Sequence, residues 1–125
     1  MAFVDIPTLN GGQVHVAADS VYRITRGIGA DSSLTRVEFG SDMQLTRLAE
    51  GDVANLLRKA GAKLIEVTAP DGTGVFLSVG AISAIRDADP HMDPPEAHAV
   101  ITVGGHRQAV RQTQADVKML LSAAG

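Results

Sequence analysis

The chain has 125 residues, of which 45% are apolar, 20% are charged and 3% are aromatic, and its formal net charge is −3. This length fits one domain or two very small ones, and the apolar share is sufficient for a packed core. The complete lack of cysteine excludes disulfides, thiolate metal sites and thiol nucleophiles, and the acidic balance argues against a strongly cationic surface.

The first third of the chain predicts short antiparallel strands. Apolar and polar residues alternate over residues 4–6 and again over 14–16, as expected of half-buried strands. Asn10-Gly11-Gly12 between them is a turn signal, because Asn and Gly tolerate positive φ. Val21 and Ile24 follow at a spacing of three, which fits either a helical turn or an irregular strand. A polar loop then leads to the next strand.

A hairpin and a helix are predicted next. Residues 35–39 and 43–48 read as two strands that are joined by a turn beginning at Gly40. An apolar stripe with helical spacing follows Asp52 and ends before Gly61. Aspartate suits the first turn of a helix and glycine suits its C-terminal end, so we predict a helix between these two residues.

The same order of elements is predicted again from residue 62 onward. Strands are expected at 65–67 and 75–79 on either side of Asp71-Gly72-Thr73-Gly74, followed by Ile82 and Ile85. The remaining elements are a polar loop at 87–96, strands at 99–103 and 108–112, and a terminal helix after Asp116.

The two halves also align residue by residue. A shift of 61 positions before the middle loop and of 64 after it gives 12 identities over 48 aligned pairs. We therefore predict a tandem duplication, with a first repeat at residues 1–61 and a second at residues 62–125. Because about 60 residues is marginal for a lone domain, the repeats are expected to share one core as a fused dimer with a pseudo-twofold axis. The predicted fold class is α+β, with two tandem repeats of antiparallel β-strands, each followed by a C-terminal helix.

The first repeat resembles the small flagellar proteins of the FlbD type. The residues that carry the resemblance are Leu9-Asn10-Gly11, the segment Asp19-Ser20-Val21-Tyr22-Arg23-Ile24 and a strand and turn at residues 35–40. The resemblance covers residues 6–60 and, less closely, 67–124. Members of that family are single-copy, whereas this chain is doubled. The resemblance implies a small accessory protein without catalytic residues.

Potential metal ligands are concentrated in the second polar loop. The segment His91-Met92-Asp93-Pro94-Pro95-Glu96-Ala97-His98 contains two imidazoles and two carboxylates, which can hold zinc or another divalent ion. However, the spacing fits no common site, and a solvated loop is the simpler interpretation. The candidate metal ligands are His91, Asp93, Glu96 and His98.

Five arginines are the candidate contacts for nucleic acid. Arg47 and Arg111 occupy the same repeat position, and Arg23, Arg26 and Arg36 could join them on a sheet face. Duplicated units of antiparallel strands followed by a helix are also the layout of whirly proteins and of transcriptional-coactivator single-strand binders. The first repeat contains six basic and seven acidic side chains and the second contains five and seven, so neither half is basic. Only three Phe and one Tyr could stack on bases.

These features predict a small non-catalytic interaction or assembly protein that acts through protein–protein contacts and self-association at strand edges or helices. The alternative is a single-stranded nucleic-acid-binding protein that uses the arginines, and a second alternative is a metal-dependent enzyme. No nucleophile elbow or phosphate-binding loop is present, so we expect neither an enzyme nor a cofactor. No apolar run approaches the roughly 18 residues of a membrane span, so no membrane insertion and a cytoplasmic location are expected.

Overall fold

The computed structural model describes residues 2–124, which alternate short strands with tight turns and carry a helix at the end of each half. The strands are β1 (Phe3–Pro7), β2 (Gln13–Ala17), β3 (Val21–Arg26), β4 (Thr35–Phe39), β5 (Asp42–Thr46), β6 (Leu64–Thr68), β7 (Gly74–Ser78), β8 (Ile82–Asp87), β9 (Ala99–Val103) and β10 (His106–Val110). The helices are α1 (Glu50–Lys59) and α2 (Gln114–Ala124), and short 3-10 turns occupy Ala18–Ser20, Gly29–Asp31 and Val79–Ala81.

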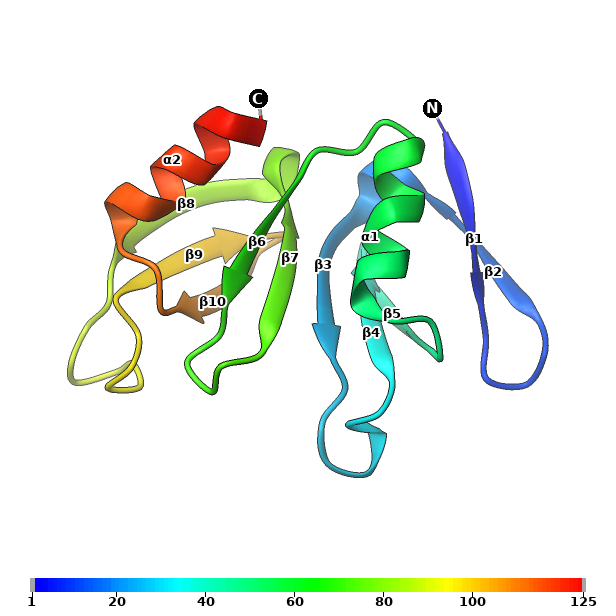
Figure 1. The fold of residues 1–125 in the computed structure, drawn as a ribbon, viewed down its shortest axis with the longest axis horizontal. Coiled ribbons are helices and arrows are strands. Elements are labelled where there is room, and N and C mark those ends of the chain that lie inside the picture. Colours follow the sequence, from blue (N-terminus) through cyan, green and yellow to red (C-terminus); the bar gives the residue numbers. More distant parts are fainter. Residues whose placement is uncertain (1, 125) are drawn as a thin grey trace.

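The strands form three antiparallel sheets, which confirms the α+β class (Figure 1). β1 and β2 make a separate two-stranded sheet, and β10, β9 and β8 make a three-stranded one. The central sheet has five strands in the order β5-β4-β3-β7-β6. Among the described residues, neither helix is long and apolar enough to cross a membrane.

The central sheet joins the two halves of the chain. β3 pairs with β7 through Arg23 opposite Leu77 and Ile24 opposite Phe76. The β6–β7 hairpin therefore extends the sheet that β3, β4 and β5 begin, whereas the equivalent β1–β2 hairpin pairs only with itself. This long-range pairing makes the sheet continuous across the boundary between residues 61 and 62.

Two hydrophobic clusters replace the single shared core that the sequence led us to expect. α1 packs against the first cluster through Val53, Ala54 and Leu57, all fully buried. α2 packs against the second cluster through Val117. The clusters exchange residues between halves: Tyr22 of β3 belongs to the second, and Phe76 of β7 and Leu64 of β6 belong to the first. Neither half therefore completes its core with its own residues.

The structure refines several element predictions. Residues 21–24 and 82–85 are strands rather than helical turns, and each follows a 3-10 turn and contains a register shift near its start. Both helices begin two residues before the predicted aspartate. Gly61 has φ of +99°, the left-handed conformation that suits the residue after a helix.

Candidate nucleic-acid interface

One face of β3 and β4 is polar because apolar and polar side chains alternate along each strand. Ile24 and Val37 are buried in the first cluster, on the side covered by α1. Arg23 lies opposite Glu38 in the antiparallel register, and Thr25 lies opposite Arg36. Since cross-strand partners share a face, these four side chains emerge together on the side away from α1.

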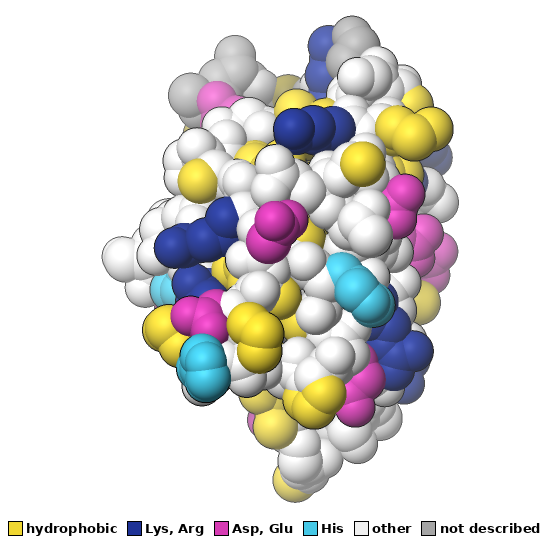
Figure 2. All heavy atoms as spheres, turned by 90° about the vertical axis from the view of Figure 1, so that its left-hand side faces the viewer, with side chains coloured by type: hydrophobic (Ala, Val, Ile, Leu, Met, Phe, Trp, Pro, Cys, Tyr) yellow, Lys and Arg dark blue, Asp and Glu magenta, His cyan; other side chains and the backbone are white. Residues whose placement is uncertain are grey.

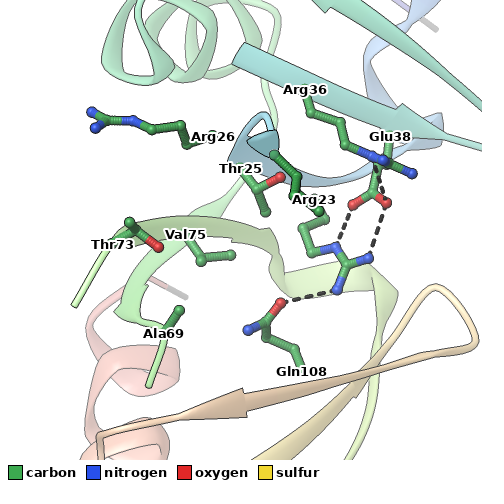
Figure 3. A pocket seen from close by; sticks show the side chains of 10 residues that line it. Arg23, Thr25, Arg26, Arg36, Glu38, Ala69, Thr73, Val75 and Gln108 are labelled. Atoms are coloured by element: carbon green, nitrogen blue, oxygen red, sulfur yellow. Dashed lines mark hydrogen bonds and ion pairs between the residues drawn. The ribbon is translucent and has the colours of Figure 1, made fainter. Parts of the chain in front are cut away.

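Three of the five predicted arginines line one hollow, which we call the arginine hollow (Figure 3). Arg23 and Arg36 lie on this face, whereas Arg26, at the end of β3, points away from them toward Glu50 at the start of α1. The hollow has a volume of about 320 Å³ and carries three arginines against one glutamate, so its lining has a surplus of positive charge. Most of its charged lining comes from β3 and β4, and the β6–β7 hairpin contributes small and apolar side chains. The lining residues are Arg23, Thr25, Arg26, Ile28, Arg36, Glu38, Ala69, Thr73, Val75 and Gln108.

A buried carboxylate organises the hollow. The guanidinium of Arg23 donates Nε and Nη2 to the two carboxylate oxygens of Glu38, the Nη2–Oε1 distance being 2.9 Å. Its Nη1 donates to Oε1 of Gln108 in β10 at 2.9 Å. The side chains of Glu38 and Arg23 are 5% and 16% exposed. Arg23 is therefore held in place, and it ties the central sheet to the three-stranded sheet.

Arg36 is less engaged than Arg23. Its Nε lies 3.4 Å from Oε1 of Glu38, which is close enough for an ion pair but is not aligned for a hydrogen bond. Its side chain is 37% exposed, and that of Arg26 is 56% exposed, with only a 3.4 Å contact to Glu50. Arg26 and Arg36 can therefore present N–H donors to a ligand in the hollow.

Arg47 lies beside Arg26 at a second depression. This depression also has a volume of about 320 Å³, and Ser32, Ser33 and the start of α1 line its wall. Within residues 2–124, Arg47 has neither an ion pair nor a hydrogen-bond partner for its guanidinium. Arg26 lines both depressions and thus links Arg36 to Arg47, whereas Arg58, in the last turn of α1, lies outside this group.

Arg111 is separate from this group. Its Nε and Nη2 donate to the backbone oxygen of Pro70 at 3.0 and 2.7 Å, which fastens the β6–β7 turn. The pair of Arg47 and Arg111 that the repeat suggested is therefore not a symmetric contact, because only Arg47 is free within the described part of the chain.

The predicted metal ligands are used in loop contacts. Both carboxylate oxygens of Asp93 accept from Nη2 of Arg107 at 2.9 Å, and Nδ1 of His98 lies 2.7 Å from the backbone oxygen of Arg111. His91 and Glu96 add no further ligands to them, and residues 2–124 contain no group of three or more side chains that could hold a metal ion. The loop is organised by hydrogen bonds and an ion pair.

Hydrogen bonds control the pKa of Asp93. Its carboxylate accepts first from the backbone N–H of Asp89, at 2.7 Å, and also from Arg107. Together these donors outweigh desolvation and hold the pKa of Asp93 below its ordinary value. Burial, followed by the nearby charge of Glu38, raises the pKa of Tyr22 beside the arginine hollow.

The side of the molecule on which α2 lies has a different character. Figure 2 shows basic, acidic and apolar side chains interspersed over it, with no gathering of one type. On this face no gathering comparable to that of the arginines on β3, β4 and the end of β5 is seen.

Sequence reasoning identified the arginines but missed Glu38, Gln108 and Ile28. Glu38 occupies a strand position between Val37 and Phe39 that reads as ordinary surface alternation, and Gln108 comes from a strand 85 residues away from Arg23. The exposure of Ile28 could have been predicted from the sequence, because an isoleucine between two glycines in a polar loop has little chance of burial.

Comparison with known proteins supplies one likeness. No family model and no curated protein matches the chain. Among solved structures, the LytTr DNA-binding domain of a Bacillus cereus response regulator matches with a TM-score of 0.60 and 17% identity, over 100% of this chain and 98% of that one. The likeness covers all three sheets and both helices, and it shows the fold.

This finding corrects two predictions. The resemblance to FlbD-type flagellar proteins is wrong, since its motif residues form turns and strands of a LytTr-like fold. The prediction of an assembly protein acting through protein–protein contacts and self-association is also wrong, because the solved structure that shares the fold is a LytTr DNA-binding domain rather than an assembly protein. Its physical basis is weak as well: the apolar stripes of α1 and α2 are buried in the chain's own clusters at Val53, Leu57 and Val117.

Proposed function

We propose that this protein is a non-catalytic DNA-binding domain. The observation that carries the proposal is the fold likeness to a LytTr DNA-binding domain over the whole length of both chains. The group of exposed arginines adds chemical support, because guanidinium groups bind phosphate oxygens in a bidentate manner. A DNA-binding role is compatible with the predicted cytoplasmic location.

Arg26, Arg36 and Arg47 are the proposed phosphate contacts. Each is exposed enough to reach a ligand, and the one hydrogen-bonded ion pair among them is the long 3.4 Å contact between Nε of Arg26 and Oε1 of Glu50. Arg23 acts as a positioning residue, since its donors are taken by Glu38 and Gln108. In this proposal Arg111 has a structural role at the β6–β7 turn.

Duplex DNA fits the surface better than single strands. Single-strand binders present aromatic side chains on which successive bases stack. Here Tyr22 and Phe76 are buried, and the exposed ring of Phe3 already stacks on His15 with 4.6 Å between ring centroids. The described residues therefore offer no row of free stacking platforms.

The test is fluorescence anisotropy with a labelled random-sequence duplex and with each of its strands, between about 50 and about 200 mM salt. The duplex should bind at low salt and weaken steeply as salt rises, because bound phosphates release counterions. Failure to bind either DNA form at low salt would disprove the proposal. Tighter binding of the single strands would favour the single-strand alternative.

Substitution of the exposed arginines tests directly whether this surface contacts the phosphates. The double variant Arg26→Gln/Arg47→Gln should lower duplex affinity about tenfold at low salt and reduce the salt slope by about one for each phosphate that is no longer neutralised. Lys59→Gln/Lys118→Gln is the matched control, because it also removes two exposed positive charges, at the end of α1 and on α2, away from the arginine group. Equal reductions in both variants would show that net charge alone, rather than this surface, drives binding.

We also propose that residues 1–61 and 62–125 are tandem repeats of one ancestral unit. Supporting this, each half follows the order of two strands, a 3-10 turn, three strands and a helix, with one additional 3-10 turn at Gly29–Asp31 in the first half. The exchange of Tyr22 and Phe76 between clusters supports packing of the repeats as one unit. An ancestral single repeat, if reconstructed, should be folded only as a dimer.

A further inference from the structure

Ile28 is a large apolar side chain that the fold leaves in solvent. It is 80% exposed, the highest value among the exposed large apolar residues of the described chain. It lies in the loop between β3 and β4, which extends beyond the end of the central sheet at the bottom of Figure 1. No packing role within the described chain explains it.

The loop holds Ile28 in a defined position. The backbone N–H of Gly27 donates to the oxygen of Leu34 at 2.9 Å, and the N–H of Asp31 donates to the oxygen of Ile28 at 3.1 Å. Gly27 is in close contact with the turn, because an added Cβ would lie 2.3 Å from the oxygen of Asp31. These contacts close the loop at its base and around its 3-10 turn, so the isoleucine is presented by an ordered scaffold.

The hollow beside this apolar side chain has a surplus of positive charge. Ile28 itself lines the arginine hollow with Arg26 and Arg36, and Arg47 lies on the other side of Arg26. Asp31 is the acidic residue of the same loop. A complementary partner must therefore combine closely spaced negative charges with apolar surface at their centre.

We propose that Ile28 is a wedge that contacts the bases of a DNA duplex while Arg26 and Arg36 hold the flanking phosphates. This inference rests on the proposed DNA-binding function and names the base-contacting residue. Isolated apolar side chains beside arginines insert at base steps in this way and partly unstack them. An anionic membrane fits less well, because stable binding there requires a wider apolar face than one side chain.

The wedge has a measurable consequence for the choice of DNA. Unstacking a base step costs free energy, and the cost falls where stacking is already interrupted. The protein should therefore bind a duplex with one abasic site more tightly than the same intact duplex. Electrostatic contacts alone would give no such preference, because both duplexes carry the same phosphates.

The experiment compares duplex affinities of the full chain and two variants by anisotropy, over a series from about 50 to about 200 mM salt. The unaltered protein should prefer the abasic duplex by about threefold to tenfold. Ile28→Ala should abolish the preference and keep the salt slope. Met119→Ala should behave as the unaltered protein, because Met119 is also apolar and 72% exposed but lies on α2. Both substitutions are at exposed positions, and circular dichroism should show unchanged folding.

The outcomes separate the two proposals. If the unaltered protein binds no duplex, the proposed function fails and the wedge fails with it. If it binds both duplexes equally, or if Ile28→Ala keeps the preference, only the wedge is overturned. Ile28-dependent binding to phosphatidylserine vesicles without any Ile28 effect on DNA would also overturn it and would assign the residue to a membrane surface.

Discussion

Glu38 shows how one buried carboxylate determines which arginines are available. It accepts two hydrogen bonds from Arg23 and lies 3.4 Å from Arg36, and it is almost completely buried. Arg23 thereby loses its freedom to bind a ligand, whereas Arg36 keeps most of its donors. The functional surface therefore depends on an acidic residue as much as on the basic ones.

Removing this carboxylate should destabilise the fold. Glu38→Ala leaves Arg23 with unpaired donors at a mostly buried site, so the free energy of unfolding should fall by about 2 to 4 kcal/mol. Glu38→Gln keeps one acceptor oxygen for Arg23, so its free energy of unfolding should fall less than that of Glu38→Ala. Arg36→Ala should cost below about 1 kcal/mol, since its contact is poorly aligned and partly solvated. Urea denaturation measures the free energy of unfolding of all three variants. A decrease in Arg36→Ala as large as that in Glu38→Ala would contradict the assignment of Arg23 as the main partner of Glu38.

Asp93 should make stability depend on pH in the acidic range. Its pKa in the folded protein lies below the ordinary value of 3.8, so its contribution is complete above that value and is lost as pH falls through the folded pKa. Asp93→Asn should therefore be less stable than the unaltered protein near neutral pH, and the difference should shrink in acid.

Thermal unfolding between about pH 7 and about pH 2 tests this linkage. Asp31→Asn is the control, because the Asp31 side chain is exposed and makes no hydrogen bond or ion pair within residues 2–124. A difference between Asp93→Asn and the unaltered protein that stays constant across this range would rule out the ionised carboxylate, with its hydrogen bonds from the backbone of Asp89 and from Arg107, as its source.

At the scale of elements, the β9–β10 turn shows how a backbone contact joins the two halves. The ring of Tyr22 from β3 rests on Gly104, where an added Cβ would lie 2.4 Å from the ring. The same ring stacks on His106 with 5.2 Å between centroids. A glycine is therefore required here by contact as well as by its φ of +56°.

Two neighbouring glycines provide a matched test of this contact. Gly105→Ala places a Cβ in open space at φ of +79°, so only the conformational cost of about 1 to 2 kcal/mol applies. Gly104→Ala adds a steric clash with Tyr22 and should cost about 3 kcal/mol or more. Equal destabilisation in urea would show that the turn conformation, and not the contact, matters.

The element order was predictable from sequence because its signals are local. Alternation identified β1, β2 and β4, and the turn residues at Gly11, Gly40 and Gly104 marked the hairpins. The pairing of β3 with β7 was not predictable, since no residue pattern in either strand specifies which other strand it pairs with. That pairing also determines the site: three of the five arginines could be identified as lining one hollow only after the register was known.

At the scale of the whole molecule, the shared sheet should make unfolding cooperative. Tyr22 is the only tyrosine, and tryptophan is absent, so intrinsic fluorescence reports on a first-half residue in the second cluster. Its transition in urea should coincide with that of far-UV circular dichroism, which follows both helices. Two separated transitions would mean that the halves unfold independently in spite of the β3–β7 pairing.

The exchange of side chains between the clusters also bears on synthesis. A ribosome releases the first half, with β1 to β5 and α1, before Leu64 and Phe76 have emerged. Until then the first cluster lacks two of its members, and β3 exposes an unpaired edge. The first half can therefore complete its core only after the β6–β7 hairpin has left the ribosome. Folding during translation should finish after this hairpin is made, and not when α1 is made.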